Sequence, residues 1–140
     1  MHKLTIFTIF CGICLLVSCS PTKENVTEAK NGPFKIAVRY REYLNSGSHN
    51  ADICVANVTS EKFPTDEVQC FLHGYDFSGL AVKWRSERDI EITFECGRVT
   101  SFRNFAVISK GQTLPVEFHA SLHETCGTKA NGATTNDAHP

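Results

Sequence analysis

Two histidines near the end of the chain have the spacing of metal ligands. His119 and His123 are four residues apart, which brings two side chains together on a helix but separates them by about 13 Å along a strand. The apolar residues around them alternate with a two-residue period, so we expect a strand whose outward face carries both histidines. A metal ion would then need ligands from a neighbouring strand. The sequence therefore predicts an exposed polar face and no cofactor, with His119 and His123 the candidates if a metal does bind.

A second group has the residue types of a hydrolase triad. His73, Asp76 and Ser78 lie within six positions of each other. A triad needs its nucleophile, base and acid to converge from separate elements beside an oxyanion hole, and the chain has no G-x-S-x-G turn. We interpret residues 73–76 as a turn and predict that the protein is not an enzyme.

The charge balance argues against a nucleic-acid partner. The 140 residues include 14 Lys and Arg against 15 Asp and Glu, for a net charge of −1. The basic residues are scattered along the chain instead of forming the basic patch that phosphate backbones require. We expect no binding to nucleic acid.

The N-terminus has the layout of an export signal. Residues 4–17 are nearly all apolar and follow Lys3, which matches the charged and apolar regions of a secretory signal peptide. The apolar run is shorter than the roughly 20 residues that a membrane-spanning helix needs. An ordinary signal peptide would be cut near Ser18 or Ser20 and would release a soluble protein.

The end of this apolar run carries a more specific motif, Leu16-Val17-Ser18-Cys19. It resembles the lipobox of bacterial lipoproteins, in which a small residue precedes a cysteine whose thiol receives diacylglycerol. The resemblance covers about the first twenty residues and implies that residues 1–18 are a signal peptide and that Cys19 is lipidated. Several acyl chains such as palmitate exceed the one-chain threshold for stable membrane attachment.

The same resemblance implies a location in the cell envelope. In Gram-negative lipoproteins an Asp after the lipidated cysteine commonly retains the protein in the inner membrane, and this chain has Ser20 there. We therefore expect the outer membrane in preference to the inner membrane if the host is Gram-negative, with the domain facing the periplasm or the exterior.

Four cysteines remain after Cys11 and Cys14 leave with the signal and Cys19 takes the lipid. They are Cys54, Cys70, Cys96 and Cys126. An even number in a small exported domain predicts two disulfides, whereas a zinc site would need closely spaced pairs. The count leaves three pairings open, and the phase of the predicted strands favours Cys70 with Cys96 and Cys54 with Cys126.

The pattern along the chain predicts one folded unit between two polar segments. Residues 19–32 and 127–140 contain too few apolar residues to offset the entropy of ordering, so we expect a flexible tether and a disordered tail around a domain at 33–126. Within that domain the apolar residues alternate with a two-residue period in seven stretches. Residues 80–84 and 90–96 form the clearest hairpin, and a phase slip near Arg103 and Asn104 suggests a bulge or bend.

Seven short strands in about 100 residues predict an all-β, antiparallel, immunoglobulin-like sandwich, and the alternative is a small closed β-barrel. Trp84 lies between Cys70 and Cys96, an order similar to that of immunoglobulin domains. Trp84 and the phenylalanines at 94, 102, 105 and 118 are expected to form its core.

Such scaffolds commonly act in recognition through their loops and edges. We therefore expect a membrane-anchored, non-catalytic domain that contacts another envelope protein, with loops 45–50 and 76–79 as its contact candidates. The alternative is a periplasmic carrier of a small ligand or a metal.

Overall fold

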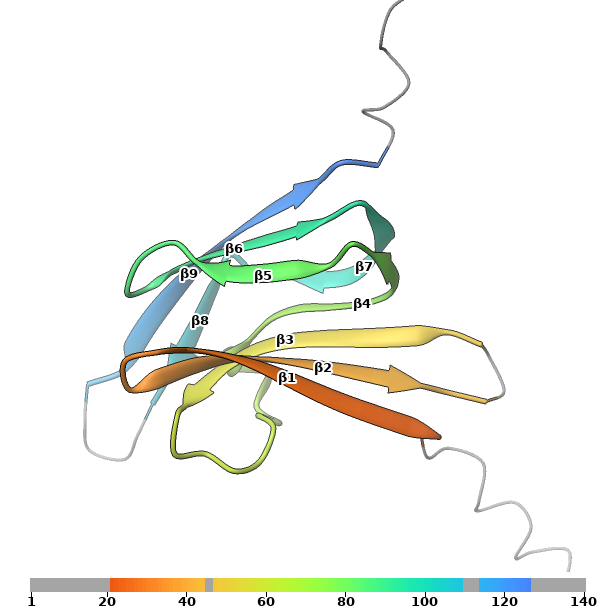
Figure 1. Ribbon diagram of the computed structural model, residues 1–140. Coiled ribbons are helices and arrows are strands. Elements are labelled where there is room, and N and C mark those ends of the chain that lie inside the picture. The colour runs from red at the N-terminus through yellow and green to blue at the C-terminus, as the bar shows by residue number, and fades with distance from the viewer. Residues whose placement is uncertain (1–20, 45–46, 110–113, 127–140) are drawn as a thin grey trace, which may run out of the picture.

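The computed structural model describes residues 21–44, 47–109 and 114–126 (Figure 1). These residues form nine β-strands and one 3-10 turn, so the all-β prediction is confirmed. The strands are β1 (Lys23–Asn31), β2 (Phe34–Glu42), β3 (His49–Asn57), β4 (Cys70–Ser78), β5 (Ala81–Trp84), β6 (Asp89–Phe94), β7 (Cys96–Phe102), β8 (Phe105–Ile108) and β9 (Val116–Glu124), and the turn is η2 (Glu67–Gln69). Within the described ranges no helix is long and apolar enough to cross a bilayer.

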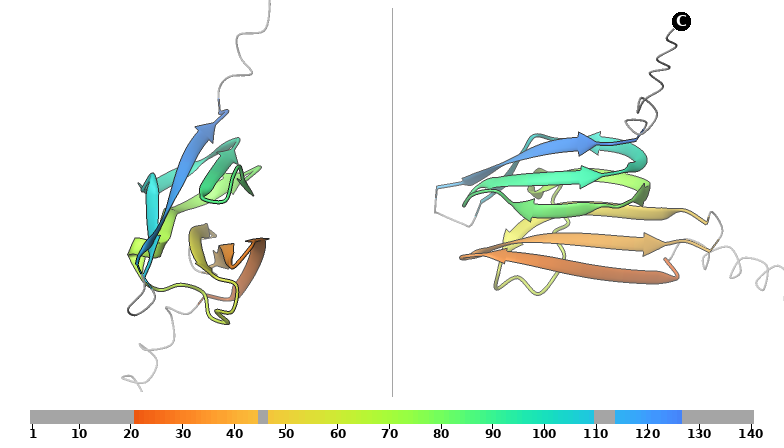
Figure 2. Two further views of the ribbon diagram at one scale, coloured as in Figure 1. Left: turned by 90° about the vertical axis from the view of Figure 1, so that its left-hand side faces the viewer. Right: turned by 45° about the horizontal axis from the view of Figure 1, so that its top comes forward.

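The strands form two sheets, seen as separate layers in Figure 2. The five-stranded sheet has the order β1-β2-β3-β4-β7 and is antiparallel throughout. The four-stranded sheet has the order β5-β6-β9-β8, and its central pair, β6 and β9, is parallel. The small closed barrel expected as an alternative is wrong, because the described strands form two open sheets. The predicted hairpin of β5 and β6 is confirmed.

The prediction of seven strands is wrong for two reasons. The first is that residues 98–109 belong to two strands. The chain leaves β7 in the five-stranded sheet at Arg103 and Asn104, where the sequence shows its phase slip, and continues as β8 in the other sheet. The Arg103 backbone N–H donates to the Phe71 carbonyl at 2.7 Å and anchors this crossing. What the sequence indicates as a bend is therefore a change of sheet.

The second reason is β1, which lies within the predicted tether of residues 19–32. Its side chains are mostly exposed, as their polarity predicts, but the strand is ordered by pairing with β2 along its whole length. The four-stranded sheet also holds it, because Trp84 Nε1 donates to the Ala29 carbonyl and Asn31 Nδ2 donates to the Ser86 carbonyl, both at 3.0 Å. Backbone pairing and two cross-sheet hydrogen bonds replace the apolar burial that the segment lacks.

The core lies between the sheets and is made of alternating residues from both. Its buried members are Ile36, Val38, Ile53, Val55, Phe71, Leu72, Ile90, Ile92, Ala106, Ile108 and Phe118. The ring of Phe118 packs edge-on against Phe34 and Trp84, with centroids 4.9 and 6.0 Å apart. Phe94 and Phe118 are buried as predicted, but Phe105 is 47% exposed, so its assignment to the core is wrong.

Two disulfides form as predicted, but in a different pairing from the one preferred above. Cys54 bonds to Cys70 and Cys96 bonds to Cys126. The first pair are register partners on neighbouring strands. Cys96 begins β7 after a bend at Glu95 instead of continuing the inward phase of β6. Because the Thr125 backbone N–H donates to the Phe94 carbonyl, the end of β9 lies beside Cys96.

Candidate functional site

The structure does not bring the predicted triad residues together. Asp76 Oδ1 accepts from the His49 backbone N–H at 3.2 Å, and Ser78 Oγ accepts from the Cys96 backbone N–H at 3.2 Å. Asp76 has a φ of 57°, a conformation that Asp tolerates in turns. Residues 73–76, interpreted above as a turn, are part of β4. The Asp76 side chain joins β4 to the start of β3 and the Ser78 side chain joins it to the start of β7, while the His73 imidazole contacts a different carboxylate.

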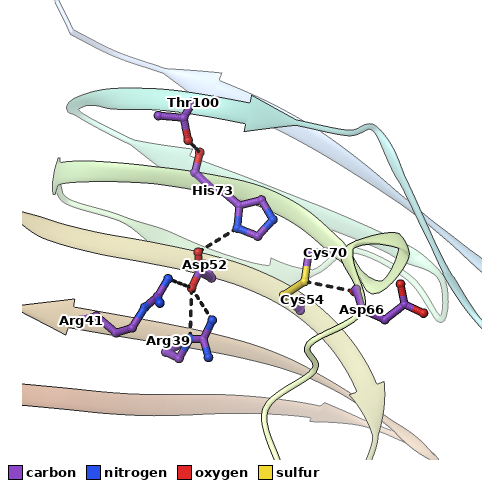
Figure 3. Close-up of polar contacts among 8 residues, drawn as sticks. All are labelled: Arg39, Arg41, Asp52, Cys54, Asp66, Cys70, His73 and Thr100. Atoms are coloured by element: carbon purple, nitrogen blue, oxygen red, sulfur yellow. Dashed lines mark hydrogen bonds and ion pairs between the residues drawn. A yellow bond between two sulfur atoms is a disulfide. The ribbon is translucent and has the colours of Figure 1, made fainter. Parts of the chain in front are cut away.

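That carboxylate is Asp52, the centre of a charge cluster on the outer face of the five-stranded sheet (Figure 3). The sheet register pairs Asp52 with Arg39 of β2 on one side and with His73 of β4 on the other. Asp52 Oδ2 accepts from Arg39 Nε at 3.0 Å, from Arg39 Nη2 at 2.8 Å and from Arg41 Nη2 at 2.6 Å. Asp52 Oδ1 lies 2.8 Å from His73 Nδ1. Three basic side chains thus converge on one carboxyl group.

The Asp52 carboxyl group is held in its charged form. Its side chain is only 5% exposed, and burial by itself raises the pKa. The hydrogen bonds from His73 and Arg39, together with the charges of Arg41 and Arg39, outweigh burial and lower the pKa of Asp52 below its ordinary value. Asp52 is therefore an ionised structural centre at neutral pH.

The loop between β3 and β4 covers part of this cluster. Arg39 Cζ lies 4.1 Å from the centroid of the Phe63 ring, a cation–π contact that holds the guanidinium over the sheet. Pro64 is buried beside Phe63 in sequence, and Lys35 Nζ donates to the Ser60 carbonyl at 2.7 Å. This cover explains why β3 is buried on both faces along most of its length.

One atom of the cluster has no hydrogen bond. Arg41 Nε is buried and lacks a partner among the described residues, whereas the Arg41 side chain as a whole is 25% exposed. His73 is more open, with 36% of its side chain exposed. The arrangement fixes three strands to one another and presents an imidazole edge at the surface.

The sequence analysis did not predict this cluster, although the sequence contains one signal of it. Arg39 and Arg41 alternate with the inward Val38 and Tyr40, which places two cations on one outward face. Their partner could not be found because the register that sets Asp52 opposite Arg39 is a tertiary property.

Two small cavities beside the five-stranded sheet are the second candidate site. A cavity of about 380 Å³ lies at one end of β1 to β3, and a neighbouring cavity of about 220 Å³ lies between β1, β2 and the start of β5. Tyr40 lines both, and burial raises the pKa of its phenol. The smaller cavity is lined by Ile36, Val38, Leu80 and Val82 among others. The larger is lined by Lys23, Arg41 and His49 among others. The larger cavity falls within the lower range of small-molecule sites.

The predicted histidine face lies on β9. His119 and His123 are exposed, and His119 Nε2 lies 3.3 Å from Glu117 Oε1 of the same strand. The register sets Asp89 and Phe105 opposite His119 on the neighbouring strands. Across the described parts of the chain, no group of three or more His, Cys, Asp or Glu side chains is placed to hold a metal ion.

The two predicted contact loops meet at one end of the sandwich. The hydrogen bond from the His49 backbone N–H to Asp76 Oδ1 joins the first residue of β3 to the last part of β4. Residues 45 and 46 of the first loop lie outside the described residues, as do the signal peptide, Cys19 and the predicted tail at 127–140.

Comparisons with family models, with curated proteins and with solved structures found no match to this chain.

Proposed function

We propose that this chain is a bacterial lipoprotein, anchored in the cell envelope through Cys19, whose β domain binds another envelope protein without catalysis. The observation that carries the proposal is the motif Leu16-Val17-Ser18-Cys19 at the end of an apolar run. Ser20 in place of Asp favours the outer membrane over the inner membrane in a Gram-negative host.

The disulfides support export. All four cysteines of the described residues are paired, and such bonds persist in oxidising compartments such as the periplasm or the cell surface. Together the bonds close loops of 16 and 30 residues, which stabilises a domain of this size against unfolding outside the cytoplasm.

The shape of the fold supports recognition. We propose that the two-layer scaffold acts as immunoglobulin-like sandwiches do, through its strand edges and connecting loops. Strand β7 is an edge of the five-stranded sheet, and four of its seven residues are exposed. An edge of this kind can pair with a strand of a partner protein.

Metabolic labelling with an alkyne palmitate tests the anchor. The wild-type protein is expected to take up label and to fractionate with membranes, and Cys19→Ala is expected to lose both. Cys14→Ala is the matched control, because this thiol lies inside the predicted signal peptide and its loss should leave labelling unchanged. A wild-type protein as unlabelled as Cys19→Ala would refute the proposal.

Cross-linking in intact envelopes tests the interaction. Affinity capture of the cross-linked wild-type protein is expected to enrich a defined envelope protein over a Cys19→Ala control expressed at the same level. Capture that returns nothing above this control would argue against a binding role.

The two cavities favour a second function, transport of a small ligand. Native mass spectrometry of protein isolated from its envelope would then show a bound small molecule. Val82→Trp is expected to displace it by filling the smaller cavity, whereas Ser121→Trp, on the outer face of the same four-stranded sheet, is the matched control. Calorimetric titration with zinc, copper and nickel tests the metal form of this alternative, and a silent titration would rule that form out.

A further inference from the structure

We infer that the anchor orients the domain, so that one end of the sandwich faces the bilayer and the opposite end faces away from it. The inference rests on the lipidation of Cys19 proposed above. The bilayer-facing end carries the β2–β3 loop and the β4–β5 turn, and the outer end carries the β1–β2 and β5–β6 turns (Figure 1).

The first step is the shortness of the link. The chain joins the sheet at Thr22, whose backbone N–H and Oγ1 both donate to the Glu42 carbonyl, at 2.9 and 3.0 Å. Only Ser20 and Pro21 separate Thr22 from Cys19. At most about 3.6 Å per residue, three residue steps span no more than about 11 Å. The tether of fourteen residues expected from sequence is therefore reduced to a link of two.

The second step is what lies beside that link. Lys23 is the register partner of Glu42, so β1 begins where β2 ends and the β2–β3 loop starts. The start of β3, which follows this loop, is joined to the end of β4, which precedes the β4–β5 turn, by the hydrogen bond from the His49 backbone N–H to Asp76 Oδ1. Ser78 pairs with Cys96, which adds the start of β7. All these segments lie at the anchored end of the sandwich.

The third step is the distance to the other end. The nine residues of β1 extend about 30 Å at about 3.3 Å per residue, nearly three times the reach of the link. Asn31, at the far end of β1, donates to the Ser86 carbonyl of the β5–β6 turn. Because β6 and β9 are parallel and Asp89 pairs with His119, the start of β9 lies at this outer end as well.

In this orientation the two ends of the sandwich face different surroundings. Of the segments that the sequence predicts for protein contact, the described residues 47–50 and 76–79 lie at the bilayer-facing end. A partner in the periplasm or at the exterior would then meet the outer turns, at residues 32–33 and 85–88.

Two exposed leucines provide matched probes. Leu44, in the β2–β3 loop, is 80% exposed, and Leu114, before β9, is 88% exposed. Leu44→Cys and Leu114→Cys would each be labelled with a fluorophore on the lipidated full chain and reconstituted in phosphatidylcholine vesicles containing a headgroup nitroxide. Non-reducing peptide maps would verify both native disulfides. We expect quenching of the Leu44→Cys probe to exceed that of the Leu114→Cys probe at least about twofold, because the ends are about 30 Å apart.

A longer link is the decisive control. Inserting fourteen Gly and Ser residues between Ser20 and Pro21 gives a flexible span of about 20 Å, and the two probes should then be quenched nearly equally. If the Leu44→Cys probe remains preferentially quenched, the short link does not cause the orientation and the inference is wrong.

The outcomes separate this inference from the proposed function. Missing palmitate on the wild-type protein would refute the anchor and the orientation together. Palmitate with equal quenching at both probes, or with stronger quenching at Leu114→Cys, would refute the orientation alone. Quenching of either probe in the unlipidated Cys19→Ala chain would show that the domain binds lipid directly. This result would also refute the inference that the anchor orients the domain.

Discussion

The outer faces of the two sheets each carry one carboxylate held by two cations, but in different surroundings. On the five-stranded sheet, Asp52 is paired with Arg39 and Arg41, whose side chains are 20% and 25% exposed. On the four-stranded sheet, Glu91 pairs with Lys83 at 2.7 Å and with Arg85, and these two side chains are 59% and 57% exposed.

The difference lies in what covers the cations and in how many strands the carboxylate joins. Asp52 bonds to side chains of β2 and β4 and is sheltered by the loop that carries Phe63. Glu91 bonds to β5 and to the residue directly after it, with solvent around both partners. Both carboxylates are themselves buried, with 5% of the Asp52 side chain and 10% of the Glu91 side chain exposed. Asp52 links three strands through sheltered cations, whereas Glu91 is held by cations that water reaches.

The largest expected effect comes from removing Asp52, the carboxylate whose cations are sheltered from water. Asp52→Ala leaves two guanidinium groups close together without their shared acceptor, and we expect a loss of about 3 kcal/mol in the free energy of unfolding. Urea denaturation of the purified domain at pH 7 measures it. Glu91→Ala is the matched variant and should shift the midpoint far less, because water solvates its exposed partners. Equal shifts for the two variants would show that burial does not distinguish the clusters.

Acid should weaken both clusters, and the direction follows from their pKa values. Hydrogen bonds from Lys83 and Arg85 lower the pKa of Glu91 from 4.5 to about 2, and the pKa of Asp52 is lowered from 3.8. A carboxyl group with a lower pKa in the folded state stabilises the fold above its unfolded pKa, and this contribution is lost as the pH falls toward the folded value.

Unfolding in urea at a series of pH values between 7 and 2 measures this loss. Glu91→Gln should flatten the decline between about pH 4.5 and 2, and Asp52→Asn should flatten it below about pH 4. A decline as steep in either variant as in wild type would contradict the assignment of that carboxylate. High salt should reduce the Glu91 contribution more than that of Asp52, because exposed charges are screened more strongly.

The smallest expected effect tests the contact between Arg39 and the loop that joins β3 to β4. Phe63→Ala removes the ring below the Arg39 guanidinium, and we expect a loss of about 1 kcal/mol. Phe63→Leu keeps most of the apolar contact but no aromatic face, so a stability equal to that of wild type would show that packing, and not the cation–π contact, holds the loop. Thermal unfolding followed by circular dichroism measures the stability of both Phe63 variants against wild type.

Strand positions were predictable where one face of a strand is buried against the other sheet. Val38 and Tyr40 flank Arg39, and Ile90 and Ile92 flank Glu91; these apolar residues contribute to the core as expected. The β1 strand could not be predicted from apolar content, because its order comes from pairing with β2 and from the Trp84 hydrogen bond. The disulfide pairing failed because Cys96 lies past the bend at Glu95, where the phase of β6 no longer applies.

The sequence by itself determined the fold class, the number of disulfides and the motif at Cys19, because alternation, cysteine count and a short linear motif are local properties of the chain. Tertiary structure decided which cysteines pair, which cations meet Asp52 and that residues 23–31 pair with β2 as a strand. These depend on strand register and on the order of strands in each sheet, which bring residues far apart in the sequence to within a few ångströms of each other.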